Sequence, residues 1–372
     1  MQRLIWLRHE TKPFEQRSCL TPNACKKLLE LGHDVIVERS PVRIFEDAEY
    51  ESVGCKLVES NSWINAPLNA IIIGLKELED ADFSLSHRHI HFAHVFKNQH
   101  GYEKTLSRFI KGDGLLYDLE YLTDSNQKRI AAFGVWAGFA GAALAIDLWT
   151  HTQLGMNYNS KAPLVPYENE MAMVDDVEER LNKIISRPRV LVIGAKGRSG
   201  KGAVKFLRAI GIEATMWGSR DTITNHPIEE ILGFDILINC ALIKEPRSPF
   251  LDLQTIEKER NLTVISDVGC DPNGPCNPLP IYENCTTMDI PSIKIQDNLY
   301  LTAIDHLPSL LPRESSEDFC SQLLPHLVDF LDNKIENSPW ERALEVFYRK
   351  SYDLSPDEIT IEENDSRDKI LM

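Results

Sequence analysis

The feature that most constrains the fold of this chain is a glycine-rich turn between an apolar run and an amphipathic helix. The apolar run is Val190–Ile193, and after the turn Val204, Leu207 and Ile210 recur at helical spacing. Strand, glycine turn and helix in this order are typical of a parallel α/β sheet that binds a dinucleotide. In such a unit the pyrophosphate lies on backbone amides at the helix N-terminus.

The predicted pyrophosphate-binding residues lie together in this turn, and they are Gly194, Gly197, Arg198, Ser199 and Gly200. The glycine spacing is one residue wider at its first step than in the GxGxxG motif. A Walker-type phosphate loop is excluded, because Lys201 is not followed by Ser or Thr. The alternative interpretation is a glycine-rich turn that binds no ligand.

The residues after the next predicted strand bear on the choice between NAD and NADP. An NAD site is expected to place an acidic residue here, where it binds the ribose hydroxyls. The strand is followed instead by Gly218, Ser219 and Arg220, which slightly favours NADP. Asp221 comes one residue later and can still reach the ribose. The expected cofactor is therefore NAD or NADP.

The length of 372 residues predicts two domains rather than one compact core. Apolar runs alternate with helical patterns along the chain, which predicts doubly wound α/β sheets. Small residues dominate Gly134–Trp149, so we expect a tightly packed helix that bridges the domains. The predicted strands are Leu4–Leu7, Val35–Glu38, Ala70–Gly74, His89–Phe96, Val190–Ile193, Ala214–Trp217, Ile236–Asn239 and Thr263–Ser266.

Bulk composition argues against several classes of protein. A net charge of −16 disfavours sequence-independent nucleic-acid binding, which requires clustered Lys and Arg. No apolar run approaches the roughly 20 residues of a membrane span, and the N-terminus has no signal-peptide core. The 8 cysteines lack CxxC spacing, which is typical of reduced thiols in a cytoplasmic protein.

A lysine follows one of the buried runs. Lys76 comes directly after Ala70–Gly74 and Leu75, so it is expected at the carboxyl end of a parallel strand, where ligands bind in open α/β sheets. A partly desolvated lysine at such a point can act as a general base, and the neighbouring Glu77 can tune it. The alternative is a solvated Lys–Glu pair on a loop.

Histidines are densest shortly after this lysine, at His87, His89, His91 and His94. Strand alternation places His89 and His91 on one face, where a metal pair is conceivable. No third ligand has a convincing spacing, and we therefore predict no metal site. One histidine acting as an acid–base group, with the others structural, is the preferred interpretation.

Charged residues also crowd the loop after the first strand, where Lys12, Glu15 and Arg17 lie close in sequence. Arg17 and the more distant Arg129 suit bidentate capture of substrate carboxylates. Taken singly, each of these residues is equally compatible with an ordinary surface charge.

Together these features resemble the lysine-forming saccharopine dehydrogenase family of the fungal type, within the alanine dehydrogenase/transhydrogenase-like superfamily. The resemblance extends from Leu7 to about Arg349. The most specific matching segments are Glu10–Pro13, Ile71–Glu77, Phe92–His94, Arg108–Gly112, Leu116–Glu120, Ala131–Gly134, Ala137–Ala143 and Ile304–Glu314.

The resemblance implies the reversible, NAD-dependent cleavage of saccharopine to lysine and 2-oxoglutarate. It implies that Lys76 takes the proton of the secondary amine and that His94 serves as the acid–base group for imine hydrolysis. Glu77 would modulate Lys76, and Glu15 would modulate a charged neighbour such as Lys12. The substrate carboxylates would be bound by Arg17 and Arg129, and Asp305 would lie near the nicotinamide.

The resemblance also implies two Rossmann-like α/β domains with an active-site cleft between them. Residues 1–133 would form the substrate and catalytic domain, joined by a C-terminal helix at 316–350. Residues 134–315 would form the dinucleotide-binding domain, and 351–372 an acidic tail. Two departures from the family stand out. Ser199 replaces a cysteine of the glycine turn, and Gly218 replaces an acidic residue, which puts strict NAD preference in doubt.

Other activities remain compatible with these residues. A related opine-type dehydrogenase would use another pair of amine and 2-oxo acid, and an alanine dehydrogenase shares the two-domain plan. From a different class, a non-catalytic dinucleotide sensor would keep the turn without the chemistry. The expected partners are small-molecule substrates, with neither nucleic acid nor membrane, and a monomeric state is compatible with the sequence.

Overall fold

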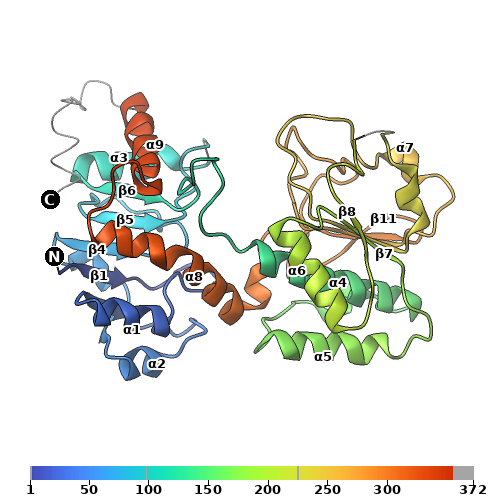
Figure 1. Cartoon of the computed structure of the whole chain (residues 1–372), viewed down its shortest axis with the longest axis horizontal. Coiled ribbons are helices and arrows are strands. Elements are labelled where there is room, and N and C mark those ends of the chain that lie inside the picture. The colour runs from blue at the N-terminus through green and yellow to red at the C-terminus, as the bar shows by residue number, and fades with distance from the viewer. Residues whose placement is uncertain (1, 98, 224–225, 355–372) are drawn as a thin grey trace. The chain divides into compact units, whose positions relative to one another are not determined.

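The computed structural model describes residues 2–97, 99–223 and 226–354 (Figure 1). The chain divides into two units, each with its own sheet. The first unit consists of Met1–Ala132 together with Ser315–Met372, and the second is Phe133–Glu314. Within the described residues, no helix combines the length and apolar character needed to cross a membrane.

The described strands of the first unit form a parallel sheet of six strands in the order β3-β2-β1-β4-β5-β6. This is the strand order of a Rossmann fold, in which the direction of winding reverses at the first strand. Every residue of β4 is buried, as expected for a parallel strand covered on both faces. The strands are β1 (Leu4–Leu7), β2 (Asp34–Glu38), β3 (Lys56–Val58), β4 (Ala70–Ile73), β5 (Arg88–His91) and β6 (Leu115–Asp118).

Helices cover this sheet and come from both ends of the chain. Thr21 caps the first of them, since its side chain accepts a hydrogen bond from the Ala24 amide. Around Trp340 of the last helix, aromatic rings pack against Tyr117 of β6. The described helices of this unit include α1 (Pro22–Glu30), α2 (Asp47–Ser52), α3 (Tyr102–Gly112), α8 (Pro312–Leu331) and α9 (Pro339–Leu354).

Two sequence-based expectations about this unit are wrong. The single helix predicted over 316–350 is two helices, α8 and α9, because Asn333 and Asn337 adopt left-handed backbone and Pro339 begins a new helix. The strand predicted over His89–Phe96 ends at His91, and His94 lies beyond it with a φ of 54°. Of the predicted acidic tail, residues 355–372 lie outside the described residues, while 351–354 belong to α9.

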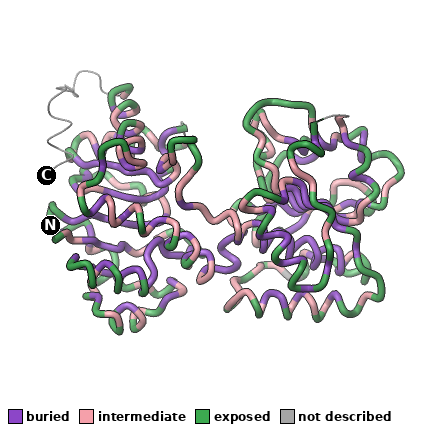
Figure 2. Tube along the Cα trace, in the orientation of Figure 1, coloured by how far each residue is buried: buried purple, intermediate pink, exposed green. Residues whose placement is uncertain are grey.

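The second unit has a sheet in the order β11-β12-β10-β9-β7-β8, parallel except for the β11–β12 pair. The winding reverses at β7, which lies between β8 and β9. The described strands are β7 (Val190–Ile193), β8 (Thr215–Trp217), β9 (Ile236–Asn239), β10 (Val264–Asp267), β11 (Ile293–Gln296) and β12 (Leu299–Thr302). Figure 2 shows that buried residues follow the strands of each sheet.

The small-residue helix α4 (Gly134–Gln153) packs along α6 (Arg198–Ala209), and the glycines at their crossing explain its composition. A β-carbon at Gly138 would collide with the backbone of Ser199, and one at Gly202 with the backbone of Val135. The predicted tight packing is thus confirmed. The helix lies wholly within the second unit and in its hydrophobic core, which corrects the expectation that it bridges domains. The short helix α7 (Leu253–Ile256) and helix α5 (Glu170–Leu181) complete the described α-helices of this unit.

Candidate functional site

Apart from Arg129, which pairs with Thr123 in an isolated bridge, the predicted catalytic and substrate-binding residues of the first unit follow the carboxyl ends of its strands. Lys12, Glu15 and Arg17 follow β1, Lys76 and Glu77 follow β4, and His94 follows β5. Because these strands are parallel, their carboxyl ends share one edge of the sheet. This is the edge where open α/β sheets bind their ligands.

The backbone at Lys76 is held by an acidic residue from the loop after β1. The Glu10 carboxylate accepts hydrogen bonds from the amides of Leu75 at 2.6 Å and of Lys76 at 2.9 Å. Glu10 is itself paired with Arg8, whose guanidinium also donates to the Lys76 carbonyl. Both charged side chains are buried, at 7% exposure for Glu10 and 2% for Arg8. Together they hold the backbone at Lys76 in one position. The sequence analysis assigned no role to either residue.

The ion pairs at this edge differ from those implied by the family resemblance. Glu77 Oε1 lies 2.6 Å from Lys12 Nζ, so the acidic partner of Lys12 is Glu77 and not, as the resemblance had implied, Glu15. Partial burial opposes ionisation of Glu77, but the hydrogen bonds from Lys12 and from its own backbone hold its pKa below the usual value. Lys76 lies half-buried beside this pair.

Arg17 makes a bidentate pair with Glu15. Arg17 Nε lies 2.7 Å from Glu15 Oε1, and Arg17 Nη2 lies 2.6 Å from Glu15 Oε2, with both side chains only 4% exposed. Burial raises the pKa of Glu15, but the Arg17 charge outweighs it, helped by Lys76, so the net pKa is lowered. The carboxylate of Glu15 therefore stays ionised and holds Arg17 in place beside Lys76.

His94 lies in a second charged group that centres on Glu120, a residue that follows β6. Glu120 contacts His94 Nδ1 at 3.9 Å, Lys97 Nζ at 2.6 Å and Arg129 Nη2 at 3.3 Å. Burial opposes its ionisation, but Lys97 and Arg129 lower the pKa of Glu120. The structure thus brings His94 and Arg129 onto one carboxylate. Glu120 had one usable signal in the sequence, because it is the last residue of the matching segment Leu116–Glu120.

Buried polar side chains lie directly behind this group. His91 is opposite Asp118 in the β5–β6 ladder, and Asp118 Oδ1 accepts a hydrogen bond from the Glu120 amide at 2.8 Å. Burial raises the pKa of Asp118 to about 7. Burial lowers the pKa of His89 and His91 well below the usual value, and their ring nitrogens have no hydrogen-bond partner within the described residues. Among the residues described, no group of three or more His, Cys, Asp or Glu is placed to hold a metal ion.

The glycine turn of the second unit has the geometry that a pyrophosphate requires. Gly194 has a φ of 78°, and Gly197 is the N-cap of α6, so Arg198, Ser199 and Gly200 form its first turn, where the amides of a helix point towards a bound anion. A β-carbon at Gly200 would collide with the backbone of Gly194. The turn is therefore a cradle that side chains would fill, which fits a dinucleotide phosphate.

A cavity of about 590 Å³ adjoins this turn, and its lining includes Gly194, Gly218 and Ser219. Arg220 is exposed beside it. Asp305 lies elsewhere in the second unit, exposed directly after Ile304 of the Thr286–Ile304 bridge and electrostatically coupled to Cys270, which follows β10.

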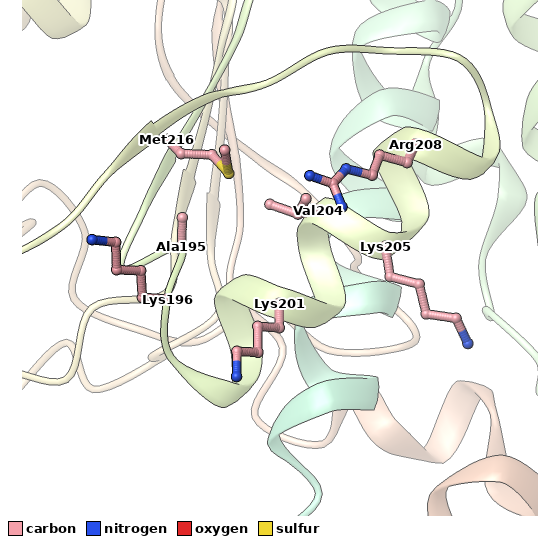
Figure 3. A pocket seen from close by; sticks show the side chains of 7 residues that line it. All are labelled: Ala195, Lys196, Lys201, Val204, Lys205, Arg208 and Met216. Atoms are coloured by element: carbon pink, nitrogen blue, oxygen red, sulfur yellow. The ribbon is translucent and has the colours of Figure 1, made fainter.

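A second cavity of about 450 Å³ lies on the outer side of α6 (Figure 3). Lysines and an arginine line it, which suggests an anion site at first sight. Figure 3 shows, however, that the ammonium groups of Lys196 and Lys205 point to opposite sides. Lys205 pairs instead with Glu170 and lies 4.5 Å from the Trp136 ring centroid. The cations do not converge on one anion.

Comparisons with known proteins agree with this architecture. Residues 6–140 match the model of the alanine dehydrogenase/PNT N-terminal domain. Among solved structures, an L-alanine dehydrogenase superposes with a TM-score of 0.70 at 17% identity and covers 96% of this chain and 100% of its own. A transhydrogenase from Sinorhizobium meliloti superposes with a TM-score of 0.59 at 17% identity, covering 90% and 95%. These two likenesses establish the two-domain α/β fold.

Sequence relatives are more specific. A Yarrowia lipolytica protein named saccharopine dehydrogenase (NAD(+), L-lysine-forming) is 45% identical over 92% of this chain and 96% of its own length. Proteins of the same name from Neurospora crassa and Schizosaccharomyces pombe are each 43% identical, over 93% and 92% of this chain and 96% and 97% of theirs. The chain therefore belongs to the lysine-forming saccharopine dehydrogenase family.

Proposed function

We propose that this chain catalyses the reversible cleavage of saccharopine, with NAD+ and water, to L-lysine, 2-oxoglutarate and NADH. The observation that carries the proposal is the 45% identity with an NAD-dependent, lysine-forming relative over nearly the full length of both chains. The positions of Lys76 and His94 at the carboxyl ends of β4 and β5 support it.

The proposed chemistry divides between two residues. When bound, the nicotinamide accepts the hydride from the carbon next to the secondary amine. Lys76 Nζ takes the proton of that amine, so that a C=N bond forms. His94 then removes a proton from the attacking water and returns one to the departing lysine nitrogen. One water is consumed and one proton is released, so atoms and charge balance.

The charged residues around Lys76 and His94 are proposed to orient the substrate and to set the electrostatic surroundings of these two side chains. Arg17 and Arg129 would bind carboxylates of saccharopine or 2-oxoglutarate. Glu15 already holds Arg17, and Glu120 contacts both Arg129 and His94. Glu77 is paired with Lys12, so the side chain of Lys76 would be left to act on the substrate amine.

The second unit is proposed to bind the cofactor. Its pyrophosphate would lie on the turn that contains Gly194, Gly197, Arg198, Ser199 and Gly200. The adenosine would extend towards Gly218, Ser219 and Arg220, and Asp305 would lie towards the nicotinamide. The names of the relatives print NAD(+), and we propose the same cofactor for this chain.

The decisive experiment follows NADH oxidation with L-lysine and 2-oxoglutarate and identifies the product by mass spectrometry. The proposal predicts saccharopine, with L-lysine and 2-oxoglutarate both required. Turnover only with another amine or 2-oxo acid would instead establish an opine-type dehydrogenase. Binding of NADH without turnover of any such pair would indicate a dinucleotide sensor and would overturn the proposal.

We further propose that the protein acts as a monomer in the cytoplasm on small-molecule substrates alone. The net charge of −16 supports the absence of a nucleic-acid partner. Sedimentation velocity of the purified chain tests the monomer, and fluorescence microscopy of a tagged chain in its source cells tests the location. A dimer in the first measurement, or an organellar signal in the second, would contradict the respective statement.

A further inference from the structure

The cofactor site lacks an expected carboxylate at the end of β8. In an NAD-binding unit, a carboxylate after this strand accepts hydrogen bonds from the ribose hydroxyls of the adenosine. Here Trp217 is followed by Gly218, which has no side chain. On the sequence alone this gap favours NADP, whereas the relatives carry NAD(+) in their names. The structure offers a way to reconcile the two.

The missing carboxylate is replaced in space by that of Asp221. Asp221 Oδ2 accepts a hydrogen bond from the Gly218 amide at 2.7 Å. The same oxygen lies 3.8 Å from the point that a β-carbon on Gly218 would occupy. The tight turn that brings it back is closed by the Asp221 amide, which donates to the Gly218 carbonyl at 3.1 Å. The charge therefore lies beside the position from which a side chain at residue 218 would project.

This position is directly connected to the phosphate-binding turn. The Gly194 amide donates to the Trp217 carbonyl at 2.9 Å, so the first glycine of the turn and the end of β8 are held together. Gly194, Gly218 and Ser219 all line the cavity of about 590 Å³. A ribose next to a pyrophosphate on this turn would thus reach Gly218, whose amide donates to the Asp221 carboxylate.

Two cations that would favour the opposite choice, Lys244 and Arg247, also line the cavity, and the guanidinium of Arg247 is already engaged by protein groups. Its guanidinium donates to the Thr222 carbonyl, lies 2.8 Å from His226 Nε2 and stacks 5.4 Å from the Phe250 ring centroid. Arg220 is exposed and follows Gly218 by two residues. The carboxylate of Asp221 is the charge that a hydrogen bond fixes on the backbone of Gly218 itself.

We propose that Asp221 determines the cofactor specificity of this chain by selecting the free 2′-hydroxyl of NAD over the 2′-phosphate of NADP. The inference rests on the proposed function, because it places the adenosine of the cofactor in this cavity. Asp221 would accept a hydrogen bond from the ribose through its second oxygen, while its negative charge would repel a 2′-phosphate.

The test measures binding of NADH and NADPH separately by fluorescence titration, without any substrate. The unaltered protein is expected to bind NADH more tightly than NADPH. Asp221→Asn keeps an oxygen that can accept from the Gly218 amide but removes the charge, so the ratio of the two Kd values should shift towards NADPH by about tenfold. The shift should come mainly from tighter NADPH binding.

Two further variants make the result interpretable. Gly218→Asp combined with Asp221→Asn places a carboxylate at residue 218 itself, where φ is not left-handed, and should restore the preference for NADH. Glu213→Gln removes an exposed negative charge from the start of the same strand region and should leave the ratio unchanged. Circular dichroism and thermal melting confirm that each variant folds.

Each outcome decides the question. An unchanged Kd ratio in Asp221→Asn, or an equal loss of affinity for both cofactors, would overturn the inference and leave Asp221 as a structural cap of the turn. A protein that already prefers NADPH would overturn it as well. Because binding is measured without substrate, a failure of the saccharopine reaction in the separate turnover assay would not affect this result.

Discussion

At the scale of single residues, the candidate site is built from side chains just beyond strand ends, each fixed by a second charged residue. Glu10 holds the backbone at Lys76, Glu15 holds Arg17, and Glu120 contacts His94. Glu10 and the Glu15–Arg17 pair are buried, in surroundings where a charge is stable only with a partner. Lys76 is the residue whose proposed role requires it to accept a proton from the secondary amine during cleavage.

Lys76→Met is expected to lower kcat for saccharopine formation or cleavage by about 10²- to 10⁴-fold, the usual contribution of a positioned acid–base group. Affinity for NADH should stay unchanged, because the proposed cofactor residues belong to the other unit. Steady-state kinetics and fluorescence titration measure the two effects. Lys26→Met, at an exposed lysine of α1, is the matched control. Unaltered kcat in the Lys76 variant would remove this residue from the mechanism.

At the scale of elements, β5 and β6 carry an unusual number of buried titratable groups. His89 and His91 are both fully buried, and Asp118 is opposite His91. The folded protein lowers the pKa of both histidines and raises that of Asp118 to about 7. As the pH falls, the lowered pKa values of the histidines reduce the stability of the folded protein, whereas the raised pKa of Asp118 increases it.

The histidines should make the first unit sensitive to acid. An unfolded histidine binds a proton near pH 6.5, whereas the folded protein resists it, so stability present above pH 6.5 is lost as pH falls. Asp118 acts in the opposite direction between about pH 7 and 3.9, because its folded form holds the proton more tightly. On β5 and β6 the two histidines outnumber Asp118, so their net effect is to lower stability as the pH falls below about 6.5.

His89→Phe tests this balance, since the ring lies among the aromatic side chains of Trp63 and Phe109. The variant has one protonation site fewer that opposes folding, so its unfolding free energy should fall less steeply between pH 6 and 4 than that of the unaltered protein. Urea unfolding at several pH values measures this. His100→Phe, at an exposed histidine, should keep the original slope. If the slope of the His89 variant is also retained, the buried histidine is not responsible.

Sequence patterns predicted the elements of this site better than its contacts. Buried apolar runs located β1, β4 and β7, and the strand-end rule placed Lys76 on the correct edge. The hydropathy pattern could not predict the ion pair of Glu77 with Lys12 or the hydrogen bond from the Gly218 amide to Asp221. Contacts between loop residues produce no periodicity in the sequence. The end of β5 at His91 was missed because apolar residues continue beyond it.

At the scale of the whole molecule, the two units have separate cores, and the first is completed by the C-terminal part of the chain. The second unit is continuous from Phe133 to Glu314, whereas the first depends on α9 packing against β6. The boundary between α8 and α9 falls in an Asn- and Pro-containing segment at 333–339, whereas the single helix over 316–350 was implied by the family resemblance.

This division predicts that damage to α9 leaves cofactor binding intact. Trp340 is 1% exposed, its ring centroid lies 4.7 Å from that of Phe330 and 5.9 Å from that of Tyr117, and its Nε1 donates to the His326 carbonyl at 2.8 Å. Trp340→Ala should destabilise the first unit by about 3–5 kcal/mol. Below its unfolding transition, the variant should bind NADH with unchanged Kd.

Calorimetry with and without NADH separates the two units. The ligand should raise only the transition of the second unit, by about 2.7 kcal/mol at 100 times Kd, while Trp340→Ala should lower only that of the first. Ile185→Ala, at a fully exposed side chain of the second unit, should change neither. If Trp340→Ala lowers both transitions equally, the units unfold as one cooperative body. The stability of the cofactor site would then depend on α9 after all.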